Sequence, residues 1–165
     1  MHYQGLLCRA LNPIRAREPM SGIGARLHAG RFNSKGIPAL YTAMSVMTAI
    51  REANQIGTLQ PTTLVPYEGD IIPIFDATDA DALGIYGVTP ADLAANDWRI
   101  RMQSKGKAPT QIVAERLIAD RYAGLRVRGF AAGANAEDLN VVLWVWGSAS
   151  LVKLVLIDDQ GRLRH

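Results

Sequence analysis

The sequence predicts a single α+β domain, because strand-like and helix-like segments are mixed along it and strands lie near both ends. Its 165 residues are about the length of one domain, 48% of them are hydrophobic, and the mean hydropathy is +0.04. This composition excludes a disordered or collagen-like chain. The succession of a strand, GxGxxG and a helix is absent from the sequence, so a Rossmann cofactor site is not predicted.

The first 41 residues are expected to form a strand, a loop and a second strand. Residues 1–12 contain a short apolar run that is typical of a buried strand. Residues 13–36 are rich in Gly, Pro and Arg and predict a loop. A short strand is then expected at Ala39–Tyr41.

A helix is expected from about Ser45 to Asn54, with Gly57 as its stop. Helical spacing predicts a core-facing stripe made of Val46, Ala49, Ile50 and Ala53. A second helix face is polar and holds Ser45, Thr48 and Glu52. The Glu52 carboxylate either faces solvent or lines a cleft, and the pattern alone favours solvent.

The remainder of the chain is expected to hold five strands and two helices. The expected strands are Thr63–Pro66, Ile71–Phe75, Leu125–Arg128, Val141–Trp146 and Leu151–Ile157. One helix begins with Thr89 as its cap and Pro90 in its first position, and the other spans Pro109–Ala123 with Gly124 closing it. The segment Gly147–Ser150 predicts a hairpin turn between the last two strands.

Several classes of protein are disfavoured by the composition. Cys8 is the lone cysteine and lies in an apolar run, which favours a small core residue over a nucleophile and excludes an internal disulfide. The three histidines are scattered and HExxH and CxxC are absent, so no metal site is expected. The longest apolar run, Val141–Trp146, is too short to span a membrane, and the N-terminus lacks the features of a signal peptide. We therefore expect a cytoplasmic protein with no membrane partner.

Basic residues are concentrated near the N-terminus. The net charge of +3 and the pI of about 9.2 are mildly basic and come without an aromatic stacking platform, so direct nucleic-acid binding is not expected. Six basic side chains lie in the first 35 residues: Arg9, Arg15, Arg17, Arg26, Arg31 and Lys35. They form either a solvated surface or a site for an anion such as a phosphate or pyrophosphate, which a guanidinium group can bind through two oxygens.

The most informative motif lies between residues 30 and 52. It reads Gly30-Arg31-Phe32-Asn33, then Gly36, Pro38, Leu40-Tyr41, Ala49 and Glu52. This run resembles the signature of RES-domain proteins. That family also has an early arginine, here Arg9, and an Asp/Asn-rich entry into a late apolar strand, here residues 138–144. The resemblance covers nearly the whole chain, so residues 1–165 would be one RES domain.

The resemblance implies a fold like that of diphtheria-toxin-type ADP-ribosyltransferases. RES-domain proteins are toxins of bacterial toxin–antitoxin pairs and act on NAD+, either by ADP-ribosylating a protein or by hydrolysing or phosphorolysing NAD+. The implied partners are an Xre-type helix-turn-helix antitoxin and a target protein that accepts ADP-ribose. NAD+ would be the substrate, and no metal is implied.

The resemblance also suggests roles for individual residues. Breaking the bond between nicotinamide and ribose passes through an oxocarbenium-like state, which the Glu52 carboxylate could stabilise while Tyr41 holds the nicotinamide ring. The expected catalytic residues are Glu52, Tyr41 and Arg31. The expected NAD+-binding residues are Arg9, Arg31, Tyr41, Lys35 and Asn140. Lys35 could equally be a solvated loop residue, and Asn140 could instead tie the entry of its strand. The three tryptophans, Trp98, Trp144 and Trp146, are expected to be core residues.

One departure from the family pattern is found near the C-terminal strands. RES-domain proteins have a serine where this sequence has Gly129, directly before Phe130 and Ala131. A missing hydroxyl would weaken the hold on water or phosphate, and a small residue would leave room for a protein side chain. The sequence therefore favours protein ADP-ribosylation over NAD+ depletion. The presence of Arg31, Tyr41 and Glu52 argues against the further alternative, a catalytically inactive binding module.

Overall fold

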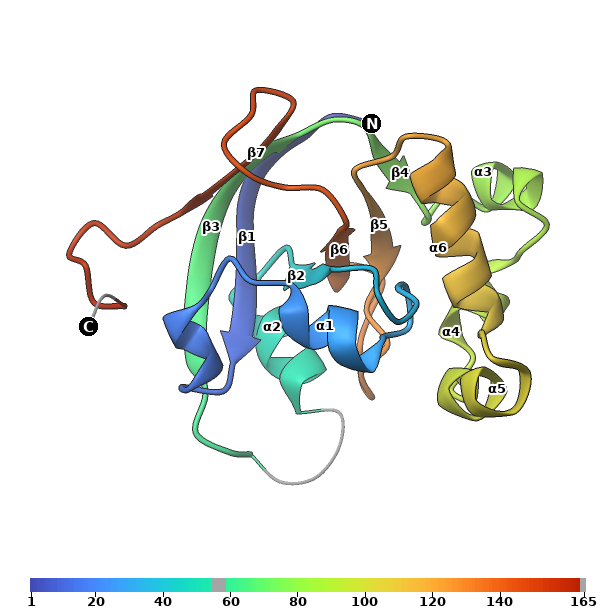
Figure 1. The fold of residues 1–165 in the computed structure, drawn as a ribbon, viewed down its shortest axis with the longest axis horizontal. Coiled ribbons are helices and arrows are strands. Elements are labelled where there is room, and N and C mark those ends of the chain that lie inside the picture. Colours follow the sequence, from blue (N-terminus) through green and yellow to red (C-terminus); the bar gives the residue numbers. More distant parts are fainter. Residues whose placement is uncertain (55–58, 164–165) are drawn as a thin grey trace.

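A single mixed sheet organises the molecule (Figure 1). In the computed structural model, which describes residues 1–54 and 59–163, the strand order is β4-β5-β6-β2-β1-β3-β7. The strands are β1 (Tyr3–Leu11), β2 (Leu40–Ala43), β3 (Thr63–Ile71), β4 (Ile74–Asp76), β5 (Gly124–Arg128), β6 (Leu139–Leu143) and β7 (Val152–Leu156). Neighbouring strands are antiparallel except for β4 and β5, which are parallel. The expected α+β class is confirmed.

The sheet is weakly joined at its centre. β1 pairs with β3 from Tyr3 to Leu11, whereas β1 and β2 pair at Cys8 and Ala43. The sheet therefore consists of two half-sheets, β4-β5-β6-β2 and β1-β3-β7, whose strands separate beyond this pair. The separation leaves space between the ends of β1 and β2, and this space is where the candidate site lies.

The helices cover the sheet unequally. They are α1 (Ile23–His28), α2 (Val46–Ala53), α3 (Ala80–Ile85), α4 (Pro90–Ala94), α5 (Trp98–Lys105) and α6 (Pro109–Ala119), with a 3-10 turn at Arg15–Arg17. Figure 1 shows α3, α4, α5 and α6 gathered beside β4 and β5, whereas α1 and α2 lie near β1 and β2. One buried core joins α6 to β5 and β6 through Val113, Leu117, Leu125 and Val142, and a second joins β1, β3 and β7 through Leu7, Tyr67 and Leu154.

Local sequence signals account for the helix starts. The Thr89 hydroxyl accepts a hydrogen bond from the Asp92 N–H while the Asp92 carboxylate accepts one from the Thr89 N–H, and Pro90 follows the cap, as predicted. α6 begins at Pro109 as predicted but ends at Ala119, because Arg121 has a φ of 70° and the chain turns there. Gly124, predicted to close this helix, instead begins β5.

Three other predictions are corrected by the structure. The segment 13–36 contains the 3-10 turn and α1 and is not loop throughout. Residues 63–71 form one continuous strand that passes through Pro66. The last two strands do not form a hairpin, because both edges of β6 are already occupied by β2 and β5, and β7 pairs with β3 instead.

The buried face of α2 also differs from the predicted stripe. Val46 and Ala53 are exposed, whereas Thr48 and Ala49 are buried. The Ser45 side chain caps the helix by accepting a hydrogen bond from the Thr48 N–H at 3.1 Å. Of the polar face, Thr48 is therefore buried and Glu52 half-buried, whereas Ser45 stays exposed. The predicted stop at Gly57 lies outside the described residues.

Candidate active site

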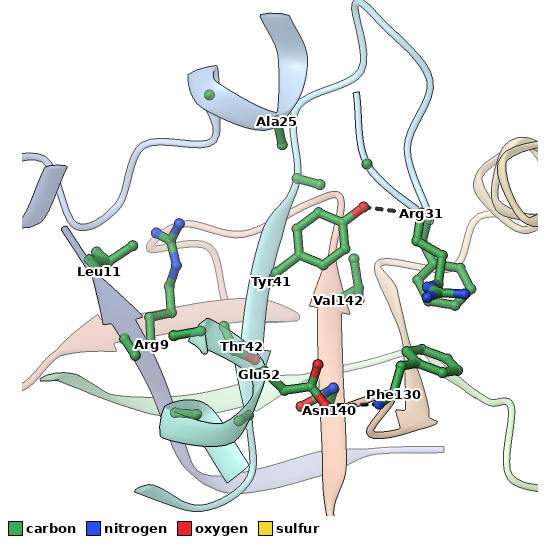
Figure 2. Close-up of a pocket in the computed structure, with 18 of the residues that line it drawn as sticks. Arg9, Leu11, Ala25, Arg31, Tyr41, Thr42, Glu52, Phe130, Asn140 and Val142 are labelled. Atoms are coloured by element: carbon green, nitrogen blue, oxygen red, sulfur yellow. Dashed lines mark hydrogen bonds between the residues drawn. The ribbon is translucent and has the colours of Figure 1, made fainter. Parts of the chain in front are cut away.

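A cavity of about 1100 Å³ lies where β1 and β2 separate. It is lined by Cys8, Arg9, Ala10 and Leu11 of β1, by Tyr41, Thr42 and Ala43 of β2, by Glu52 of α2, by Trp98 and Arg99 of α5, and by Phe130, Asn140 and Val142, among others. Its volume slightly exceeds the range of about 300–1,000 Å³ that is usual for small-molecule sites. Figure 2 shows Arg9 of β1, Tyr41 of β2 and Glu52 of α2 around this space.

Glu52 reaches the cavity from the polar face of α2. Its Oε1 accepts hydrogen bonds from the backbone N–H of Phe130 at 2.9 Å and of Ala131 at 3.3 Å. The interpretation of Glu52 as a solvent-facing surface acid is therefore wrong, and the alternative, an acid that lines a cleft, is confirmed. These two N–H groups hold the carboxylate beside the cavity, and Figure 2 shows Glu52 next to Phe130, the donor of the first bond.

Arg31 lies on the other side of Tyr41 from Arg9 (Figure 2). Its Nη1 donates to the carbonyl oxygens of Leu93 at 3.0 Å and Ala95 at 2.7 Å, and its Cζ is 4.2 Å from the centre of the Phe130 ring. Burial lowers the pKa of the Arg31 guanidinium, and the neighbouring Glu52 carboxylate opposes this shift. The Nη1 atom of Arg31 thus fixes the side chain, and the plane of the guanidinium group packs on the Phe130 ring.

Tyr41 uses its hydroxyl to fix the loop that carries Arg31. The hydroxyl donates to Asn33 Oδ1 at 2.7 Å and accepts from the Phe32 N–H at 3.0 Å. Burial raises the pKa of the Tyr41 phenol. A Cβ at Gly30 would overlap the same hydroxyl, so the glycine of the motif allows the loop to approach the strand closely. The aromatic ring, rather than the hydroxyl, is the part of Tyr41 that can serve a ligand.

We expect Tyr41→Phe to lower the stability of the protein more than its affinity for a ligand. The change leaves the buried Asn33 Oδ1 and the Phe32 N–H without their partner, which costs about 1–3 kcal/mol in the free energy of unfolding. Urea unfolding measures this loss. The matched control is Tyr122→Phe, a half-buried tyrosine that packs edge-on against Phe75 at 5.3 Å. Equal stability of the two variants would contradict this role of the hydroxyl.

Arg9 and Asn140 also lie at the cavity, whereas Lys35 does not. Arg9 Nη1 donates to the Pro19 carbonyl at 2.9 Å, which fixes the guanidinium on the β1 side. Asn140 on β6 lies beside Glu52 (Figure 2), and its buried Oδ1 has no hydrogen-bond partner within the described part of the chain. Lys35 is exposed and is not among the lining residues, so its predicted binding role is not supported. Asn33 and Ser34 before it are buried, and the loop turns Lys35 outward.

Part of the cavity wall comes from residues that the sequence motifs do not include. Arg99 lines the cavity with its Cζ 4.4 Å from the Trp98 ring, and Phe130 supports Arg31. Trp98 was expected to be a core residue; it is buried but also contributes to the lining. The pairing of Arg99 with an adjacent aromatic was the one available signal. Trp144 is a core residue as predicted, and its Nε1 donates to the Phe32 carbonyl at 2.8 Å.

Gly129 does not provide open space at the cavity wall. A Cβ built at this position would lie 2.7 Å from Glu52 Oε1 and 3.2 Å from the Asp138 carbonyl oxygen. The room expected for a protein side chain is therefore occupied by the Glu52 carboxylate. The expectation that Gly129 leaves room for the side chain of a protein acceptor is therefore wrong.

Other kinds of chemistry receive no support from the geometry. Burial raises the pKa of the Cys8 thiol, which makes it a poor nucleophile at neutral pH. Among residues 1–54 and 59–163, no three His, Cys, Asp or Glu side chains are grouped so that they could hold a metal ion. In the same residues, no helix combines the length and the apolar character needed to cross a membrane.

The arrangement suits an anionic ligand that carries hydroxyl groups. Four arginines line the cavity, Arg9, Arg15, Arg31 and Arg99, against two acids, Glu18 and Glu52. The Glu52 carboxylate and the Asn140 Oδ1 offer acceptors for hydroxyl donors beside the Tyr41 ring.

Comparison with known proteins identifies the family. No curated protein matches the chain. Among solved structures, a chain of the crystal structure of the M. tuberculosis MbcT-MbcA toxin-antitoxin complex is similar, with a TM-score of 0.69 and 20% sequence identity over 96% of this chain and 84% of that chain. This likeness shows the fold. The model of the RES domain matches residues 6–164, and the chain therefore belongs to the RES-domain family.

Proposed function

We propose that this RES-domain protein is the toxin of a bacterial toxin–antitoxin pair, and that its cavity binds NAD+ and breaks the bond between nicotinamide and ribose. The observation that carries the proposal is the Glu52 carboxylate, held by two backbone N–H groups at a cavity with arginines on both sides. The structural similarity to a chain of a toxin–antitoxin complex supports the proposed role as a toxin. The cytoplasm, where NAD+ is available, is the proposed location.

Five of the residues that line the cavity have a role in the proposed reaction. Positive charge develops on the ribose as the nicotinamide bond lengthens, and the fixed Glu52 carboxylate stabilises that charge without reorganising. The Tyr41 ring packs against the nicotinamide, which leaves as a neutral molecule. Arg9 and Arg31 bind the pyrophosphate. Asn140 Oδ1, which has no hydrogen-bond partner among residues 1–54 and 59–163, accepts a hydrogen bond from a hydroxyl or amide of the substrate.

The proposed fate of the ADP-ribose is transfer to a target protein, as the family resemblance implies, together with a fold relationship to diphtheria-toxin-type ADP-ribosyltransferases. NAD+ depletion by hydrolysis or phosphorolysis is the second candidate. The contact between Gly129 and Glu52 favours this second candidate, because it removes the gap through which a protein side chain was expected to approach.

NAD+ labelled on its adenylate separates these possibilities. The protein is incubated with the labelled NAD+ with and without cell extract. Label on a protein band supports transfer, and free labelled ADP-ribose or its phosphate without extract supports depletion. Intact NAD+ in both reactions would contradict the proposed activity and leave a binding module.

We expect the cognate antitoxin, proposed to be of the Xre helix-turn-helix type, to compete with NAD+ for the cavity. An acidic or carboxylate-terminated segment fits the excess of arginine over acid in the lining. Rising antitoxin concentrations should therefore raise the apparent KM for NAD+ and leave kcat unchanged. A purely noncompetitive pattern, or a complex in which the cavity stays open, would contradict this prediction.

A further inference from the structure

We propose that Asp138 is a positioning residue for Glu52: it ties α2 to the loop 129–138, and this tie keeps the Glu52 carboxylate on the Phe130 and Ala131 N–H groups. The kinetic part of this inference rests on the proposed cleavage of NAD+. Asp138 is not among the residues that line the cavity, so any influence on the reaction must pass through other residues.

The Asp138 carboxylate is buried and fully engaged. Its Oδ1 accepts from Thr48 Oγ1 at 2.7 Å and from Arg51 Nη1 at 2.6 Å, and its Oδ2 accepts from the Asn135 N–H at 2.9 Å. The side chain of Asp138 is 6% exposed, against 39% for Arg51. The hydrogen bond from the Asn135 N–H, followed by the one from Thr48, lowers the pKa of the Asp138 carboxyl, so it is ionised at neutral pH.

These contacts close a ring with Glu52. Thr48 and Arg51 lie on α2 within one turn of Glu52 and bind the Asp138 side chain. The Asp138 carbonyl oxygen accepts from the Gly129 N–H at 2.6 Å. Gly129 is followed directly by Phe130 and Ala131, whose N–H groups return to Glu52 Oε1. Helix and loop are therefore joined twice, once through Asp138 and once through Glu52.

The geometry leaves little tolerance between the two joints. The Cβ position of Gly129 is 2.7 Å from Glu52 Oε1, so the loop backbone lies directly against the carboxylate. A shift of the loop relative to α2 would move the two N–H donors and the carboxylate apart. Misplacement of a reacting group by about 1 Å can cost about 100-fold in rate.

The first test replaces Asp138 with Asn and measures kcat and KM for NAD+. The asparagine amide has one oxygen and one NH2 group, so it can replace only one of the two carboxylate oxygens as an acceptor. In one orientation its NH2 group faces the Asn135 N–H, and in the other it faces the donors of Thr48 and Arg51. We expect kcat to fall about tenfold, while the KM for NAD+ stays within about threefold, because the arginines that bind the pyrophosphate are unchanged.

Thr48 supplies a conservative pair of variants. Thr48→Val removes the hydroxyl that Asp138 accepts and keeps the volume, whereas Thr48→Ser keeps the hydroxyl. We expect the valine variant to follow Asp138→Asn and the serine variant to recover kcat. Asp76→Asn is the matched control, since Asp76 pairs with Arg126 between β4 and β5, away from the cavity, and this variant should retain kcat.

Amide hydrogen exchange of Phe130 and Ala131 provides a readout that does not depend on any reaction. Both amides are bonded to Glu52, so they should exchange slowly in the wild type and at least about tenfold faster in Asp138→Asn and Thr48→Val. Gly129→Ala should accelerate the same two amides while the Asp138 carboxylate is retained, because the added Cβ displaces the Glu52 carboxylate. The same Cβ also lies 3.2 Å from the Asp138 carbonyl oxygen, so this variant disturbs the loop from the Glu52 side and from the backbone of residue 138.

The outcomes separate this inference from the proposed function. Unchanged exchange at Phe130 and Ala131 in Asp138→Asn would overturn the positioning role, whatever the protein does to NAD+. A loss of kcat in Asp76→Asn equal to that in Asp138→Asn would also overturn it, because general destabilisation would then explain the effect. A wild-type protein that leaves NAD+ intact, but in which Asp138→Asn accelerates the two amides, would contradict the proposed function alone.

Discussion

Glu52→Gln is expected to abolish most NAD+ cleavage while the protein stays folded. Glutamine has the shape of glutamate, and its Oε1 can keep the hydrogen bonds from the Phe130 and Ala131 N–H groups. The negative charge that would stabilise the oxocarbenium-like state is lost. Removal of one such electrostatic group typically lowers turnover by about 10²–10³-fold. Single-turnover assays with labelled NAD+ measure the effect on the chemical step.

The control for this variant is the same substitution at an exposed position. Glu68 lies on β3, is exposed and does not line the cavity, so Glu68→Gln should retain the turnover of the wild type. The thermal midpoints of both variants should stay near that of the wild type. A Glu52→Gln enzyme within about threefold of wild-type turnover would show that this carboxylate does not take part in the chemistry.

Arg31→Lys is expected to lower kcat/KM for NAD+ by about 10–100-fold, mainly through KM. A lysine ammonium cannot bind the Leu93 and Ala95 carbonyls, stack on Phe130 and still present a second nitrogen to a pyrophosphate. Each hydrogen bond to a charged group contributes about 1.5–3 kcal/mol, which corresponds to about ten- to a hundredfold in affinity. Steady-state kinetics and calorimetric titration with NAD+ measure the change.

Arg116 offers a close structural match for the control. Its Nη1 also donates to a backbone carbonyl, that of Tyr86 at 2.8 Å, and its Cζ is 4.8 Å from the centre of the Tyr86 ring. It lies on α6 and does not line the cavity. Arg116→Lys should therefore leave the KM for NAD+ unchanged. If both variants raised KM equally, loss of stability rather than of a binding group would explain the result at Arg31.

Local signals predicted the fold where local interactions determine it. The capped start at Thr89, the proline start at Pro109 and the strand that ends at Arg128 all follow from neighbouring residues. The hairpin expected around Gly147–Ser150 failed for a non-local reason. β6 is already paired on both edges, so the last strand finds its partner in residues distant along the chain.

The candidate site shows the same division. Arg31, Tyr41 and Glu52 were identified from the motif between residues 30 and 52, and the structure brings all three to one cavity. The sequence pattern did not predict that Glu52 points toward the cavity. An apolar stripe usually marks the buried face of a helix, whereas α2 buries Thr48 against Asp138. Arg99 lies on α5, which packs on α6, and the adjacent Trp98-Arg99 pair in the sequence does not show that this packing brings the arginine to the cavity.

The division of the sheet into half-sheets has a consequence for folding. The half-sheet β1-β3-β7 is assembled from residues 3–11, 63–71 and 152–156, and the other half-sheet is assembled from segments that lie between these. Neither half-sheet can form from one continuous stretch of chain. Each must wait for contacts between residues far apart in sequence, which is the property that slows β-rich proteins to folding times of about milliseconds to seconds. The cavity therefore comes into existence late, when the two interleaved halves have closed around it, and no fragment of the chain can be expected to contain it.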